Sequence, residues 1–170
     1  MTLNALVQPL RFVEFFQGLS PAQLHAIAAC AERVVFKPGD AIIKVDEPAA
    51  AAILIVSGEA RRVDGPGVGE VEVLPQGTLV GEMGMLVETI YSSTVVAATS
   101  VRALRFVRDD MLKLMTADAS VAEHFVAVIT ARLRDVASEM RDIDRGLELA
   151  VGAAFGEPAT APLEQGPHLH

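Results

Sequence analysis

The chain has 170 residues, of which 51% are hydrophobic and 21% are charged, and its formal net charge is −8. This length predicts one modest domain, and this composition predicts a folded globule rather than a disordered chain. The negative charge opposes nonspecific attraction to nucleic acid, whose binding draws mostly on contacts with phosphates. We therefore expect no direct binding to DNA.

The first region, residues 1–33, is predicted to be helical. Apolar side chains recur three to four residues apart at its start, at Leu3, Leu6, Val7 and Leu10. Ser20 is expected to cap a second helix, because Pro21 suits the first helical position and Gln23 completes a capping box.

Residues 34–117 are predicted to form a β structure. Turn residues punctuate short apolar runs, and the candidate strands are residues 41–43, 52–56, 60–63, 71–74, 94–98 and 101–106. Short strands at regular intervals favour a closed or double-sheet structure, and a jelly roll, or double-stranded β-helix, fits best. The glycine-rich run 64–69 lacks the Lys-Ser or Lys-Thr of a phosphate loop, so we interpret it as a hairpin tip. The predicted fold class is mainly β with flanking helices.

The most informative pattern lies at residues 79–98, LVGEMGMLVETIYSSTVVAA. Its opening and its close resemble the phosphate-binding cassette of the cyclic nucleotide-binding domain family, the sensor domain of the catabolite activator and fumarate-nitrate regulator superfamily. The residues that carry this resemblance, and that become candidate ligand contacts, are Gly81, Glu82, Met83, Gly84, Tyr91, Ser92 and Ser93.

The resemblance implies a one-turn helix whose backbone N–H groups face a cyclic phosphate. It implies that Glu82 accepts a hydrogen bond from the ribose 2′-hydroxyl, and that Ser92 or Ser93 donates to a phosphate oxygen. The alternative is that Glu82 and the two serines only organise a tight loop.

This chain departs from the family at Tyr91, which stands where the family has an Arg before the Ser. Tyr91 can donate one neutral hydrogen bond but cannot neutralise a phosphate. Loss of a charge-assisted bond weakens binding by about ten- to a hundred-fold or more. Cyclic AMP or cyclic GMP is therefore expected to bind weakly, unless another cation such as Arg61 or Arg62 enters the pocket.

Residues 118–149 are predicted to form one long helix, with Asp118 and Ser120 as candidate caps. Apolar residues alternate in steps of four and three, which defines a heptad seam of Ala122, Val126, Ile129, Leu133, Val136, Met140, Ile143 and Leu147. We expect this seam to pair with a second copy of the chain, the alternative being that the helix packs on its own β structure. The resemblance implies that this helix also closes over the base, with Ser138 as a candidate contact and Ala137, which has no donor, beside it.

Residues 150–170 are rich in Ala, Gly and Pro and are expected to form a flexible tail. Regulators that this chain resembles continue into a basic winged helix-turn-helix, whereas this tail has almost no basic residues. His168 and His170 lack a third ligand, so no metal site is expected.

The sequence offers little for catalysis. Cys30 has no adjacent His and is expected to be an inert buried thiol, while His25 and His124 lie in predicted helices. Neither a Gly-x-Ser-x-Gly nor a His-Glu-x-x-His motif is present. We expect no catalytic residue, no resident cofactor and no enzymatic activity.

The lone Cys, the lack of a run of membrane-spanning length and the lack of a secretory signal pattern favour the cytoplasm. Two functions follow. The first is a sensor that binds a small cyclic nucleotide weakly or with altered specificity and signals through its long helix to a protein partner. The second is a ligand-free dimeric adaptor that works through protein contacts.

Overall fold

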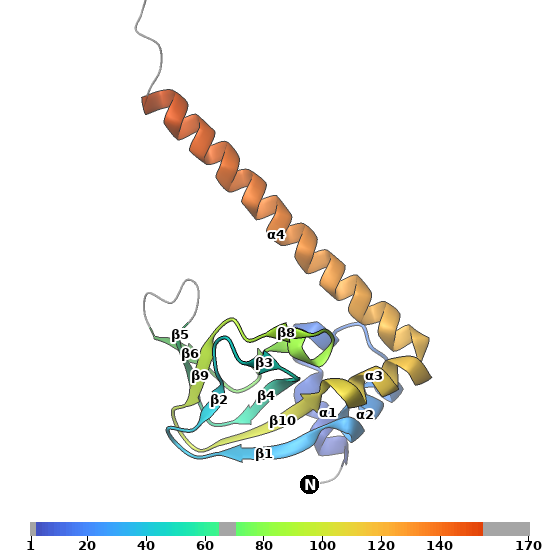
Figure 1. Ribbon diagram of the computed structural model, residues 1–170. Coiled ribbons are helices and arrows are strands. Elements are labelled where there is room, and N and C mark those ends of the chain that lie inside the picture. The colour runs from blue at the N-terminus through green and yellow to red at the C-terminus, as the bar shows by residue number, and fades with distance from the viewer. Residues whose placement is uncertain (1–2, 65–70, 155–170) are drawn as a thin grey trace, which may run out of the picture. The chain divides into compact units, whose positions relative to one another are not determined.

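A computed structural model describes residues 3–64 and 71–154 of the chain (Figure 1). The chain divides into two compact units, one ending at Val128 and the other beginning at Ile129. Helices α1 (Leu3–Leu10), η1 (Glu14–Phe16) and α2 (Pro21–Cys30) precede the strands, and α3 (Arg108–Ala117) and α4 (Ala119–Ala154) follow them.

The strands form an antiparallel jelly roll, as the sequence predicts. One sheet has the order β1-β10-β4-β7, a second has the order β2-β9-β5-β6, and β3 pairs with β8. The bounds are β1 Glu32–Phe36, β2 Ala41–Ile43, β3 Pro48–Ala49, β4 Ala51–Ser57, β5 Ala60–Asp64, β6 Glu72–Leu74, β7 Leu79–Val80, β8 Thr89–Ile90, β9 Thr94–Ala97 and β10 Val101–Val107.

The roll holds an aliphatic core between its two sheets. Its members come from β2, β4, β5, β6, β7, β9 and β10, among them Ile43, Ile53, Ile55, Val95 and Val101. Strand residues alternate in direction, so those between the core positions face the other way. On β10 the alternate residues Leu104 and Phe106 are also buried, because helices cover that outer face.

Aromatic side chains join the helices to the outer face of the first sheet. The rings of Phe15 and Phe125 stack with centroids 5.5 Å apart, and Phe16 lies 5.6 Å from Phe106. The start of α4, which carries Phe125, therefore belongs to the roll unit.

The capping box at Ser20 is confirmed: its hydroxyl accepts from the Gln23 N–H at 3.3 Å, and its own N–H donates to Gln23 Oε1 at 2.8 Å.

The six candidate strands are confirmed, with ends shifted by a residue or two. The strands that sequence patterns missed are β1, β3, β7 and β8, three of which have only two residues. The run expected to form a hairpin tip falls mostly on residues 65–70, outside the described residues.

The long C-terminal helix is confirmed but extends further than predicted. It continues to Ala154, so the expectation of a flexible tail from residue 150 was wrong for residues 150–154. No Gly or Pro interrupts residues 147–151, and the Gly at 152 alone does not stop the helix. The rest of the predicted tail, with His168 and His170, lies outside the described residues.

Asp118 is the one residue between α3 and α4, and it caps the second helix as predicted. Its Oδ1 accepts from the Ser120 N–H at 3.0 Å and from the Ser120 hydroxyl. These bonds, the one from the hydroxyl foremost, hold the pKa of the Asp118 carboxyl below its usual range.

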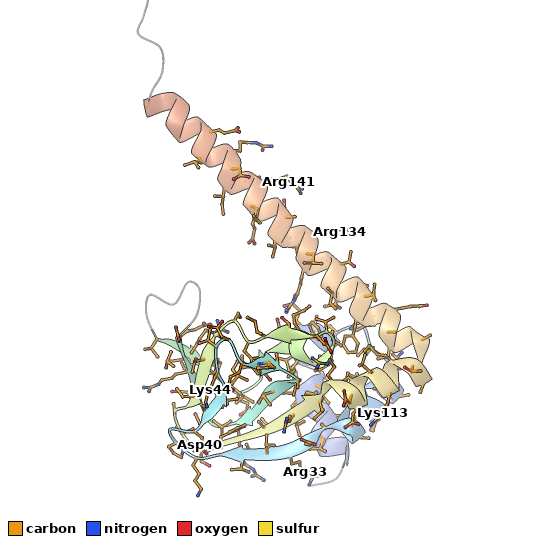
Figure 2. All side chains as sticks on the ribbon, viewed as in Figure 1. Arg33, Asp40, Lys44, Lys113, Arg134 and Arg141 are labelled. Carbon is orange, nitrogen blue, oxygen red and sulfur yellow. The ribbon has the colours of Figure 1, made fainter. Side chains whose placement is uncertain are left out.

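Most seam residues of α4 are exposed in the single chain. The exposed fractions of Val126, Leu133, Met140 and Ile143 are 63%, 64%, 62% and 68%. Ile129 is half-buried and Val136 is exposed. Figure 2 shows Arg134 and Arg141 projecting from the same helix.

The aromatic cluster should dominate the stability of the roll unit. Phe16 is 1% exposed, whereas Phe12 is 80% exposed. We expect Phe16→Ala to lower the free energy of unfolding by about 3–5 kcal/mol, since it leaves a cavity. Phe12→Ala, the matched control, should change it by less than about 0.5 kcal/mol. Chemical denaturation of both variants tests this, and equal losses would contradict the packing described.

Candidate functional site

The cassette begins at a left-handed glycine. Gly81 has φ of +67° and precedes η2 (Glu82–Met85), whose turn is closed by a bond of 2.9 Å from the Gly84 N–H to the Gly81 carbonyl. A Cβ added at Gly84 would lie 2.8 Å from the Ala49 Cβ and 3.0 Å from the Ala51 oxygen. Glycine at both positions therefore lets the cassette backbone lie against residues 49–51.

Tyr91 packs its ring on Gly81. A Cβ added at Gly81 would lie 2.6 Å from Cε1 of Tyr91, so the ring occupies the space that a side chain there would need. The Tyr91 hydroxyl donates to the Ala51 carbonyl at 2.9 Å. Its backbone N–H donates to the Glu47 carbonyl at 3.0 Å and its carbonyl accepts from the Asp46 N–H at 2.9 Å.

From the sequence, the Tyr91 hydroxyl could donate a neutral hydrogen bond to a ligand. In the structure this hydroxyl donates to the Ala51 carbonyl instead. Burial raises the pKa of the Tyr91 hydroxyl, which keeps it a neutral donor at physiological pH. The ring also packs against the core of the roll. At the position where the sequence resemblance implies a cation, this chain has a half-buried side chain whose hydroxyl bonds the cassette to β4.

The other cassette candidates differ in exposure. Ser93 is buried, at 7% exposed, and Ser92 is exposed, so the two are not equivalent. Glu82 and Met83 are half-buried on η2. Ser138 lies on the part of α4 beyond Val128 and is exposed, and its role as a ligand contact stays a prediction.

The two arginines considered as replacement cations lie on opposite faces of β5. Arg61 is exposed and lies 3.8 Å from Glu59. Arg62 shares the inner face with buried Ala60, and its Nη1 lies 2.6 Å from Glu72 Oε2. Of the two, Arg62 faces the inside of the roll.

Sequence reasoning missed Arg108, the first residue of α3. Its Nη1 donates to the Ala49 carbonyl at 2.8 Å and to the Val87 carbonyl at 3.1 Å, and its backbone N–H donates to the Ala50 carbonyl at 2.9 Å. It therefore joins the segment that follows η2 to β3. Its position at a junction of strand and helix was the only local signal, since no motif includes it.

A groove of about 860 Å³ lies elsewhere on the roll unit. It runs between α1 and the outer face of the first sheet, and shares no residue with the cassette. Its walls include Phe12, Val35 and Arg102, together with Arg33, which Figure 2 shows projecting from β1. The groove is thus separate from the site that the cassette defines.

Within residues 3–64 and 71–154, no three His, Cys, Asp or Glu side chains gather as metal ligands, and no helix is long and apolar enough to cross a membrane.

Cys30 is half-buried rather than fully buried, and burial foremost raises the pKa of its thiol, which disfavours the reactive thiolate. The His124 ring bonds to the Phe15 carbonyl at 3.1 Å and packs on Phe125, which is a structural contact.

Comparison with known proteins addresses the family directly. The family model described as the cyclic nucleotide-binding domain matches residues 33–118, just over half of the chain. The chain belongs to the cyclic nucleotide-binding domain family. It thus carries a regulatory domain of the kind that binds cyclic nucleotides, and its jelly roll is the fold of this family.

Two curated relatives and one solved structure illustrate the match. The chain is 28% identical over 128 residues to the cyclic AMP receptor protein of Thermus thermophilus, covering 74% of this chain and 59% of the relative. It is 33% identical over 93 residues to a cAMP-dependent protein kinase regulatory subunit of Colletotrichum orbiculare, covering 55% and 24%. The catabolite activator protein of Thermus thermophilus superposes with a TM-score of 0.62 at 27% identity, covering 76% and 62%. The chain therefore spans between a quarter and three fifths of these curated relatives.

Burial of the Tyr91 hydroxyl should give a measurable pH dependence, because burial raises the pKa of this group. The buried neutral phenol contributes stability that is fully present below the unfolded-state pKa, about 10, and is lost as pH rises through the folded-state pKa. We expect Tyr91→Phe to lower the free energy of unfolding by about 1 kcal/mol at neutral pH, with the difference shrinking above about pH 10.

Tyr91 is the only Tyr and the chain has no Trp, so phenolate absorbance reports on this side chain alone. The folded protein should titrate above the value of the denatured protein. Titration at or below that value would show that the hydroxyl is not buried as described.

Proposed function

We propose that this chain is a regulatory module that binds a cyclic nucleotide weakly and signals through α4 to a protein partner. The observation that carries this proposal is the cassette itself. Gly81 and Gly84 hold its backbone against residues 49–51 as a built loop, while Tyr91 occupies the position of the phosphate-pairing cation. The chain keeps the backbone shape of a binding cassette, but the neutral Tyr91 stands in the place of its positively charged side chain.

Weak binding follows from the chemistry of the retained groups. Ser92 and Ser93 offer neutral hydroxyl donors, and the Tyr91 hydroxyl already donates to Ala51. Neutral hydrogen bonds are about half as strong as charge-assisted ones. Cyclic AMP or cyclic GMP should therefore be held without the ion pair that the family resemblance implies.

The adaptor remains the second candidate, and one observation favours it. Tyr91 fills the space on Gly81 and makes its bonds to Glu47, Asp46 and Ala51 without any ligand. A cassette stabilised in this way needs no nucleotide to stay folded. In that case the exposed surfaces of α4 and of the roll would carry the function alone.

We further propose a homodimer formed through α4. The seam residues Val126, Leu133 and Met140 are more than 60% exposed in the single chain, and a heptad seam is buried when it meets another helix. We also propose that the chain is a binding module rather than an enzyme, since burial disfavours the reactive thiolate of Cys30. The net charge of −8 fits a protein that makes no direct contact with DNA. We propose that it acts in the cytoplasm.

Binding of cyclic nucleotides tests the proposed function. We expect calorimetry to give dissociation constants of roughly 100 µM or weaker for cyclic AMP and cyclic GMP, because the cassette lacks its cation. Tyr91→Arg should tighten binding by about ten-fold or more. Tyr91→Phe is the matched control, since it retains the ring and adds no charge.

Submicromolar binding by the unchanged chain would contradict the proposed weakness. If neither the unchanged chain nor Tyr91→Arg binds any cyclic nucleotide while both remain folded, the sensor fails and the adaptor stands.

The oligomeric state tests the role of α4. We expect the chain to sediment as a dimer at tens of micromolar and Leu133→Asp with Met140→Asp to sediment as a monomer, because two charges would be buried in the seam. The control is Arg134→Asp with Arg141→Asp, which places the same groups one position away from the seam and should leave the dimer intact. A monomeric unchanged chain would remove the second subunit from the proposal.

A further inference from the structure

Arg62 is a cation on the inner face of the roll. On β5 it lies two residues after Ala60, which is fully buried, and its backbone pairs with Val95 of β9. Residues two apart on a strand share a face, so Arg62 faces the core side. Arg61 between them is exposed on the other face.

The guanidinium of Arg62 is only partly satisfied. Nη1 lies 2.6 Å from Glu72 Oε2, on the neighbouring strand β6. Nε is buried and has no acceptor among the described residues. Buried donors are nearly always hydrogen-bonded, so an unpaired one needs an explanation in function or in a missing partner.

The register of β9 places Arg62 opposite Val95, which lies two residues after Ser93. Ser93 precedes Val95 by two residues and is buried, as Val95 and Ala97 are, so it continues their face. Val95 pairs with Arg62 on one side and with Ile43 on the other. Tyr91 packs on the core cluster that includes Val95 and Ile43. Arg62 therefore belongs to the same inner surface as Ser93 and Tyr91.

We propose that Arg62 pairs with the phosphate of the bound cyclic nucleotide, in place of the cation missing at position 91, and that Glu72 is its resident counter-ion. This inference rests on the proposed function, since it assigns a contact within the same nucleotide site.

The geometry of the guanidinium allows this role. An Arg presents five N–H donors in a rigid fork, and one edge of the fork can bind an oxyanion while another nitrogen holds a carboxylate. Glu72 takes Nη1, which leaves the N–H of Nε for a phosphate oxygen. The side chain of Arg62 as a whole is 34% exposed, although Nε itself is buried, so a phosphate reaches this N–H only if the side chain moves.

The same pair limits the affinity. The carboxylate of Glu72 repels an approaching phosphate, so the two side chains act on an anion with opposite signs. A purely structural ion pair behaves differently, because removing either partner then affects the fold in the same direction. The signs of the two substitutions thus separate a ligand role from a structural one.

The test is calorimetric titration of cyclic AMP and cyclic GMP into the full chain and three variants. Arg62→Gln should weaken binding by roughly three- to ten-fold, since the bond is charge-assisted but partly screened by solvent. Glu72→Gln should tighten binding by a few-fold, because it removes a nearby like charge. Arg61→Gln, the control on the outer face of β5, should leave affinity unchanged.

Salt provides a second readout. The affinity of the unchanged chain should fall as salt rises, and that of Arg62→Gln should fall less, since screening weakens interactions between charges. Thermal denaturation of each variant confirms that the roll remains folded.

Several outcomes overturn the inference. If the unchanged chain binds a cyclic nucleotide and Arg62→Gln binds it equally well, Arg62 is not the phosphate contact although the proposed function holds. Equal weakening by Arg62→Gln and Glu72→Gln indicates a structural pair. If the Tyr91→Arg variant described above binds a cyclic nucleotide and the unchanged chain does not, Arg62 does not replace the missing cation. If none of these proteins binds, the proposed sensor fails together with the inference.

Discussion

The candidate site depends on the backbone of residues 49–51, where the cassette approaches the sheet. The carbonyls of Ala49, Ala50 and Ala51 accept, in order, from the Arg108 side chain, the Arg108 N–H and the Tyr91 hydroxyl. Buried carbonyls need such partners, because an unsatisfied one destabilises the fold by about 1–3 kcal/mol. The small side chains of these three residues and the absence of one at Gly84 also let η2 lie against them, since a Cβ added at Gly84 would lie 2.8 Å from the Ala49 Cβ.

This arrangement separates residues that stabilise the cassette itself from a side chain with a polar atom that has no partner among the described residues. The glycines of the cassette and Tyr91 all make contacts that stabilise the loop itself, so a domain without a ligand would keep them. The unpaired Nε of Arg62 has no such role, since nothing in the described core uses it. The likeness of the cassette to those of its family is therefore evidence about folding first, and the contact that we propose for an anion lies on another strand.

What the sequence predicted well depends on local interactions. The Ser20 capping box, the Asp118 cap and the strands bounded by turn residues arise from residues a few positions apart, which a pattern can reveal. Strands of two residues, such as β3 and β8, carry too little alternation to be recognised. The bond from Tyr91 to Ala51 joins residues 40 positions apart, and that from Arg108 to Ala49 joins residues 59 apart. Only the folded chain brings such residues together, which is why Tyr91 could be singled out from the sequence but its partner could not.

Asp118 joins α3 directly to α4, with no flexible loop between the two helices. A loop of several residues between two helices can absorb a shift of either one by changing its backbone angles, as hinges do. Here a single residue, fixed by its bonds to Ser120, separates α3 from α4. Arg108, which holds the cassette, is the first residue of α3. A displacement of the cassette that moves Arg108 and α3 should therefore also move the first turn of α4, because no loop lies between the two helices to absorb it.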